Sequence, residues 1–203
     1  IMPVPVRTGY TFVGWFTAVT DGEQLTDAEG KSLKKYDKDE AIILYAVFEA
    51  NANKVSFDAN GGTGSMPEQT IHTDEIAKLV SNTFAKAGYT FVGWATAPDG
   101  KKVYNDTQSI EMGMESFTLY AVWKAKINTI RFDANGGSGE AFSQDIATDE
   151  TRVLTKNTYT KNGYAFVGWA TTPSGAIAYA DQASYTMGTD ASYTLYAVWE
   201  LAD

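Results

Sequence analysis

The stretch Gly88-Tyr-Thr-Phe-Val-Gly-Trp-Ala-Thr-Ala-Pro-Asp-Gly100 returns 75 residues later as Gly163-Tyr-Ala-Phe-Val-Gly-Trp-Ala-Thr-Thr-Pro-Ser-Gly175, with ten of 13 positions identical. Recurrence at a fixed period indicates a chain built from structural repeats. Phe57-Asp-Ala-Asn-Gly-Gly62 recurs from Phe132 at the same offset of 75, and Thr118-Leu-Tyr-Ala-Val-Trp123 recurs from Thr194 at an offset of 76. The fold is therefore decided by a module of about 75 residues.

A third, incomplete copy stands at the front of the chain. Gly9-Tyr-Thr-Phe-Val-Gly-Trp15 matches the middle block and Leu44-Tyr-Ala-Val-Phe48 matches the closing block, but the opening block has no counterpart. We predict three modules: residues 1–50, truncated and lacking the first strands, then residues 51–126 and residues 127–203, both complete. The connections at 49–54 and 124–129 are short and not rich in Gly or Ser. Flexible tethers have that composition, so we expect consecutive modules to lie close together in a stiff or semi-stiff rod.

Within the module, hydrophobic alternation predicts strands. Val55, Phe57 and Ala59 alternate with polar residues, as a half-buried strand requires. The following Asn60-Gly61 predicts a tight hairpin turn, with a second strand at about 69–76. Further strands are expected at 89–96, 102–104 and 117–123, with a turn at 98–100 between the first two.

The segment 76–87 lacks strand alternation, and its apolar residues and terminal Gly88 favour a short helix. Its equivalent at 151–162 is richer in Thr and poorer in helix formers. We therefore predict an α+β, β-rich fold of tandem β-grasp (ubiquitin-like) modules, each a mixed sheet with at most one short helix.

Composition narrows the function classes. The chain has 25 acidic and 16 basic residues, a formal net charge of −9, and this balance argues against nucleic acid as a partner. It has no cysteine, which excludes disulfides, thiolate zinc sites and thiol nucleophiles. The longest apolar run, 41–48, is too short to cross a membrane, so we expect no direct membrane insertion. The sequence begins within the repeat pattern and carries no signal peptide, so we interpret it as a fragment of a longer protein.

The residues that suggest chemistry each have a structural interpretation, which we favour. Four tryptophans could stack on sugars, but a small module needs large buried side chains; they are Trp94, Trp123, Trp169 and Trp199. Asp58 and Asp133 precede Asn-Gly turns, where carboxylates commonly bond their own backbone. His72 is the only histidine and aligns with Ala147. No Gly-x-Ser-x-Gly turn, phosphate loop or EF-hand pattern occurs, and nothing favours an isopeptide bond. We assign no catalytic, cofactor-binding or metal-binding residue.

The three blocks, taken together and in order, closely resemble the Listeria–Bacteroides repeat, the B-repeat type of module in internalin-like bacterial surface proteins. The resemblance implies a β-grasp module arrayed in tandem between a distal ligand-binding domain and a cell-wall anchor, in exported proteins without established catalytic residues. One departure is that the prolines that usually precede the Gly-Tyr block occur only in the first copy, as Pro3 and Pro5.

From the repeats and this resemblance we expect a non-catalytic segment of a secreted, cell-wall-associated surface protein, acting as spacer or stalk and in adhesion. The alternative is a module that binds a carbohydrate or host protein through exposed aromatic or acidic surface. The truncated first module suggests a further hypothesis, because a sheet without its opening strands leaves an unpaired edge. We expect this module to be the least ordered, or to be completed by residues 1–6 or by self-association with a neighbouring molecule.

Overall fold

Every regular element that the structure describes is a β-strand. The computed structural model describes residues 1–35, 40–190 and 192–202. Spatial contacts divide the chain into two compact units, one of residues 1–60, 64–84 and 93–122 and the other of residues 61–63, 85–92 and 123–203. The division into three modules at residues 50 and 126 stays a prediction. Over the described ranges, no helix has the length and hydropathy needed to span a membrane.

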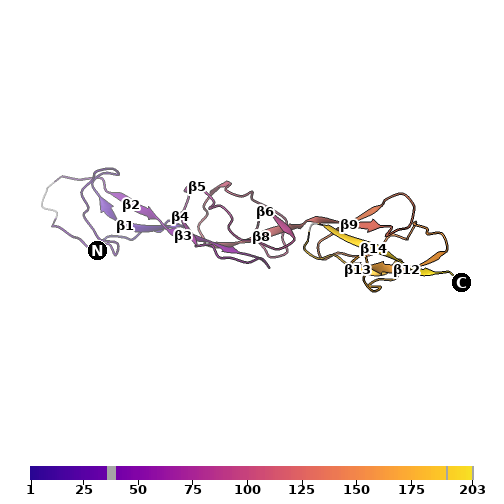
Figure 1. Ribbon diagram of the computed structural model, residues 1–203. Helices are drawn as coiled ribbons and strands as arrows, with labels where there is room; N and C mark the ends of the chain where they lie inside the picture. The colour runs from indigo at the N-terminus through magenta and orange to yellow at the C-terminus, as the bar shows by residue number, and fades with distance from the viewer. Residues whose placement is uncertain (36–39, 191, 203) are drawn as a thin grey trace. The chain divides into compact units, whose positions relative to one another are not determined.

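The last repeat forms a four-stranded mixed sheet in the order β10-β9-β14-β12, and β9, β14 and β12 are labelled in Figure 1. Its strands are β9 (Ile127–Asp133), β10 (Ser143–Ala147), β12 (Tyr164–Ala170) and β14 (Ser192–Leu201). The central pair, β9 and β14, is parallel, whereas the outer strands pair antiparallel to them. A separate two-stranded sheet joins β11 (Thr151–Val153) to β13 (Ser184–Thr186).

The middle repeat has the same plan. Its sheet has the order β4-β3-β8-β6, and β5 pairs with β7 apart from it. The strands are β3 (Ala52–Asp58), β4 (Gln69–His72), β5 (Ile76–Lys78), β6 (Tyr89–Ala95), β7 (Ser109–Glu111) and β8 (Phe117–Ala125). The parallel pair is β3 with β8. The first repeat contains only the antiparallel pair β1 (Tyr10–Phe16) and β2 (Tyr45–Ala50) in its described part.

The predicted α+β β-grasp fold is wrong. No residue of the described chain is helical, and the segment expected to form a helix, 76–87, begins with β5 and continues without regular secondary structure except for one β-bridge at Ala85. In the last repeat, β11 and a segment that forms only isolated bridges occupy the equivalent positions 151–162. The modules are all-β, with mixed sheets and no helix packed against them.

Side-chain amides explain why these segments do not form helices. Gln144 donates to the carbonyl of Val153 at 2.9 Å and accepts from the amide of Thr155 at 2.9 Å. Asn157 bonds both the amide and the carbonyl of Tyr159, at 2.9 and 3.0 Å. Such bonds give the backbone an alternative to helical pairing. The middle repeat makes the same bonds with Gln69 and Asn82.

The strand predictions for the middle repeat were mostly confirmed, but the connection after β3, the strand at 102–104 and the strands β5 and β7 were not predicted correctly. Asn60 and Gly61 do adopt the positive φ values of a turn, 47° and 83°. They do not form a two-residue hairpin, because β3 ends at Asp58 and β4 begins only at Gln69. The expected strand at 102–104 is reduced to one bridge between Trp94 and Tyr104, and β7 was not predicted.

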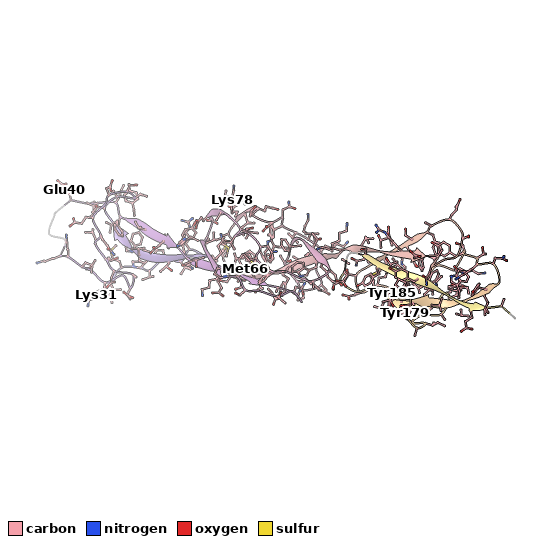
Figure 2. The ribbon with its side chains drawn as sticks, in the orientation of Figure 1. Lys31, Glu40, Met66, Lys78, Tyr179 and Tyr185 are labelled. Carbon is pink, nitrogen blue, oxygen red and sulfur yellow. The ribbon has the colours of Figure 1, made fainter. Side chains whose placement is uncertain are left out.

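One tryptophan lies at the centre of each complete repeat. Trp169 is 0% exposed, and its ring centroid lies 4.8 Å from that of Phe132 and 4.9 Å from that of Phe166. Tyr185, a member of this core, packs edge to face with the partly buried Tyr179 at 5.2 Å; both side chains are labelled in Figure 2. The buried cluster comprises Ile130, Phe132, Ile146, Leu154, Tyr159, Trp169, Tyr185, Met187, Leu195 and Ala197.

The middle repeat fills the corresponding positions with similar side chains. Phe84 stands where Tyr159 does, and Ile110 stands where Tyr185 does. Met112 and Met187 are both buried at the same repeat position. Because the same positions are buried in both copies, the repeat of the sequence is also a repeat of the core.

Replacing Trp169 with alanine should lower the free energy of unfolding of the last repeat by about 3–5 kcal/mol, because it empties the centre of the core. Urea unfolding followed by circular dichroism measures the change. The control is Val153→Ala in the same repeat, where the side chain is 55% exposed and the expected change is within about 0.5 kcal/mol. Equal losses for the two variants would show that Trp169 does not organise this core.

Candidate functional site

Two of the four tryptophans that could have formed a sugar platform are internal. Trp94 and Trp169 are both fully buried, which confirms the prediction that they fill the core. The Trp169 indole N–H has no hydrogen-bond partner, so the ring contributes through packing alone. A sugar cannot reach either ring without unfolding the repeat.

The other two, Trp123 and Trp199, are half-buried near the ends of β8 and β14. Trp199 donates from its indole to the carbonyl of Ala134 at 2.9 Å and packs edge to face on Phe166 at 5.8 Å. Trp123 packs on Phe91 in the same manner at 5.7 Å. Part of each ring is therefore structural and part faces solvent.

The aspartates before the Asn-Gly turns are occupied by their own backbone, as expected. Asp133 accepts from the amide of Asn135 at 2.7 Å, and Asp58 does the same for Asn60. The Asn135 side-chain amide then donates to two carbonyls, of Pro173 at 2.8 Å and of Ala197 at 2.9 Å. Asn60 makes the matching pair of bonds in the middle repeat. This turn ties three separate segments of the module together.

His72 belongs to a turn whose main acceptor is a glutamate. Glu75 accepts from the His72 amide at 2.8 Å, and its carboxylate lies 3.1 Å from the His72 ring. The backbone N–H of His72, and then its side chain, lower the pKa of Glu75. Glu150 accepts from the amide of Ala147 in the same way, and this bond together with Arg152 lowers its pKa. The turn therefore forms with or without the histidine, and in the described part of the chain no cluster of three or more His, Asp or Glu could hold a metal ion.

A cavity of about 500 Å³ lies in the first repeat. Its apolar lining includes Met2, Leu25, Ile42 and Leu44. Within the described residues β2 pairs only with β1, whereas its counterparts β8 and β14 also have a parallel partner. Residues 1–6, which were expected to complete the sheet, do not pair with β2. The Met2 amide instead donates to the Gly30 carbonyl and the Pro3 carbonyl accepts from the Trp15 indole, both at 2.8 Å. Self-association through the unpaired edge of β2 stays a prediction.

Sequence reasoning missed the most regular polar contact, which joins successive repeats. The Tyr10 hydroxyl of the first repeat donates to Asp74 of the second at 2.6 Å. In the same way, the Tyr89 hydroxyl donates to Asp149 of the third at 2.7 Å. The hydrogen bond to the carboxylate is the main cause that raises the pKa of each tyrosine. We call the Gly-Tyr pair of one repeat together with the Thr-Asp pair of the next the repeat junction.

The residue that connects two successive repeats is also hydrogen-bonded to the junction through its backbone. A single residue, Lys126, separates β8 from β9; its amide donates to the Gly88 carbonyl at 2.8 Å, and its carbonyl accepts from the Thr148 amide at 2.9 Å. Asn51 makes the same two bonds, to Gly9 and from Thr73, each at 3.0 Å. The connections are therefore held by hydrogen bonds.

A buried amide positions the threonine of the junction. The Asn128 side chain is 1% exposed and donates to the Thr148 hydroxyl at 3.0 Å and to the Gly188 carbonyl at 3.2 Å. Its counterpart Asn53 bonds Thr73 and Gly113 identically. A Cβ at Gly88 would lie only 2.5 Å from the Thr148 methyl carbon, and the φ of +74° there also disfavours other residues. The recurrence of Gly-Tyr, Thr-Asp and the buried Asn was the sequence signal for this contact.

Comparison with known proteins agrees with the repeat pattern. The model of the Listeria-Bacteroides repeat domain matches residues 1–47, 54–122 and 129–198. Two proteins of Evansella cellulosilytica, one named as a Gly-rich membrane protein and the other as a membrane protein, are each 31% identical over 96% of the chain, covering 23% and 28% of their own lengths. Internalin H of Listeria monocytogenes is 34% identical over 58% of the chain and 20% of its own length. The chain thus spans less than a third of these relatives.

Replacing Asn135 with aspartate should destabilise the last repeat by about 1–3 kcal/mol at neutral pH, because a carboxylate would face two carbonyls and lose both donated bonds. Those carbonyls should raise the folded-state pKa of the new carboxyl above its unfolded value. The stability lost at neutral pH should therefore be partly regained at acid pH and lost again as pH rises through the folded pKa. Urea unfolding across this pH range is the measurement.

The matched control is Asp133→Asn, which keeps an oxygen able to accept from the Asn135 amide and should cost less. A loss in the Asn135→Asp variant that did not change with pH would contradict the assigned role of the amide.

Proposed function

Because the chain belongs to the Listeria-Bacteroides repeat family, we propose that it is a non-catalytic spacer segment of a bacterial cell-surface protein. The repeat junction carries this proposal. The same tyrosine-to-aspartate bond and the same backbone bonds occur at both transitions between repeats. A spacer must hold successive modules in a defined relation, and bonds at each transition oppose free swivelling.

The fate of the polar side chains supports a structural role. Asp58 and Asp133 accept from backbone amides in the Asn-Gly turns, and the asparagines of these turns donate to backbone carbonyls. Glu75 and Glu150 accept from backbone amides in the turns beside the junction. A catalytic site instead brings a nucleophile, a base and an orienting group together in a concave pocket. These side chains make bonds that maintain the module.

Cell-surface placement is supported by the names of the relatives, which describe membrane proteins and an internalin. We place the chain outside the cell, associated with the wall, and we propose that it presents a more distal part of its parent protein to the surroundings. Antibodies against the chain should then label intact cells, whereas labelling only after lysis would contradict this placement.

A spacer with bonded junctions should give a narrow distance distribution between spin labels in successive repeats. The described chain contains no cysteine, so labels can be placed specifically at the exposed positions Lys101 and Ser174 through Lys101→Cys and Ser174→Cys. Double electron–electron resonance measures the distribution. Adding Asp149→Ala should broaden it by removing the carboxylate at the junction.

The control is Asp145→Ala, which removes an equal charge from the same repeat at a side chain that bonds Thr129 within the module. The control should leave the distribution narrow. A broad distance distribution between the labels in the chain without the Asp149→Ala or Asp145→Ala change would contradict the spacer proposal.

The second candidate function is carbohydrate binding, and the half-buried Trp199 favours it. Exposed indole faces stack well on sugar rings. Titration with a soluble chito-oligosaccharide should then produce a saturable change in tryptophan fluorescence that is lost in Trp199→Phe. A fluorescence signal that is unchanged at all sugar concentrations would contradict carbohydrate binding, and the spacer function would then be the one remaining proposal.

A further inference from the structure

The last repeat carries a third copy of the junction's Gly-Tyr surface, at Gly163 and Tyr164. The Ala202 amide donates to the Gly163 carbonyl at 3.0 Å, as Lys126 does to Gly88. The Lys161 ammonium lies 4.5 Å from the Tyr164 ring centroid, and Lys86 lies 4.3 Å from that of Tyr89. The surface is therefore built in the same way as the two that are covered.

Its exposure differs from theirs. Gly88 is buried and a Cβ there would collide with Thr148, but a Cβ at Gly163 meets no atom within 4 Å. Tyr164 is 40% exposed, whereas Tyr10 and Tyr89 are only partly exposed under the aspartates that they contact. Gly163 and Tyr164 thus present an open glycine and a phenol donor side by side.

The two covered surfaces identify the chemistry of the occupant. Each is covered by a turn in which a threonine methyl lies over the glycine and an aspartate with positive φ, 64° at Asp74 and 63° at Asp149, accepts from the tyrosine. We propose that Gly163 and Tyr164 form a docking surface for the Thr-Asp turn of another repeat module joined after residue 202. This inference rests on the proposed spacer function and extends it: each repeat presents a Gly-Tyr surface to which the Thr-Asp turn of the next repeat docks.

A covalently joined module is favoured over a separate molecule for two reasons. In both junctions the residue equivalent to Ala202 uses its carbonyl to accept from the threonine amide, so the connecting chain itself forms part of the contact. The contact is also small, one tyrosine and one glycine with a few hydrogen bonds, and interfaces between separate proteins bury much larger areas. Linkage within one chain supplies the high effective concentration that such a contact needs.

The test compares the chain with a version extended after residue 202 by a second copy of residues 127–202. Hydroxyl-radical footprinting with mass spectrometry reports the solvent accessibility of each tyrosine side chain. In the parent chain Tyr164 should be labelled faster than Tyr10 and Tyr89. In the extended chain labelling of Tyr164 should fall to the level of Tyr89, while Tyr10 stays unchanged.

Two variants of the extended chain check the contact itself. Gly163→Ala strains the backbone equally with and without the extension, but its methyl would clash only with a docked threonine, so labelling of Tyr164 should return to the undocked level. Changing Asp149 to alanine in the appended copy alone should also restore labelling of Tyr164, with Tyr89 still protected.

Each other outcome counts against a definite claim. Unchanged labelling of Tyr164 on extension, with Tyr10 and Tyr89 protected, would overturn the docking surface and leave the spacer proposal standing. Labelling of Tyr10 and Tyr89 as fast as Tyr164 in the parent chain would refute the junction and the spacer proposal together. Protection of Tyr164 that grew with concentration of the parent chain would refute docking restricted to a joined module.

Discussion

The structure depends on burying one tryptophan in each complete repeat. A module of about 75 residues that has no cysteine to form a disulfide has few other sources of stability. An aromatic side chain of this kind buries about 150–250 Å², worth roughly 4 to 6 kcal/mol at about 25 cal/mol per Å². Leaving the Trp169 indole N–H without a partner costs about 1–3 kcal/mol, so packing outweighs the lost hydrogen bond. The parallel pair β9 and β14 contributes Ile130, Phe132, Leu195 and Ala197 to the buried cluster that contains this ring, and β13 contributes Tyr185.

The need to enclose this tryptophan explains why amide side chains form hydrogen bonds with backbone groups around the core. The sheets are small, and the segments after β5 and β11 contribute buried residues to the core but pair with other backbone at only a few positions. Gln144 and Asn157 supply the hydrogen bonds that a neighbouring strand would otherwise give. Unbonded backbone groups beside a core are costly, so these amides stabilise an all-β fold where a helix would have satisfied its own backbone.

Sequence predicted what is local or periodic. The repeats, the principal strands and the burial of Trp94 and Trp169 followed from recurrence and alternation, and the family followed from three ordered blocks. The helix at 76–87 was wrong because Gln69 lies well before the segment whose backbone it bonds, and hydrophobic spacing does not reveal such a partner. The junction was missed for a related reason. Tyr89 and Asp149 are 60 positions apart, and although both recur from repeat to repeat, recurrence alone does not show that one contacts the other.

The repeat junction links this fold to the spacer function that we propose, because Thr148 is held both by buried Asn128 and by the connecting residue Lys126. A module with a loose core could not present its Thr-Asp turn in a fixed position. The most direct measurement is hydrogen exchange of the Trp169 indole followed by nuclear magnetic resonance. The account predicts exchange as slow as the slowest backbone amides of β9 and β14, since both require the repeat to unfold. Indole exchange as fast as that of an exposed tryptophan would contradict it.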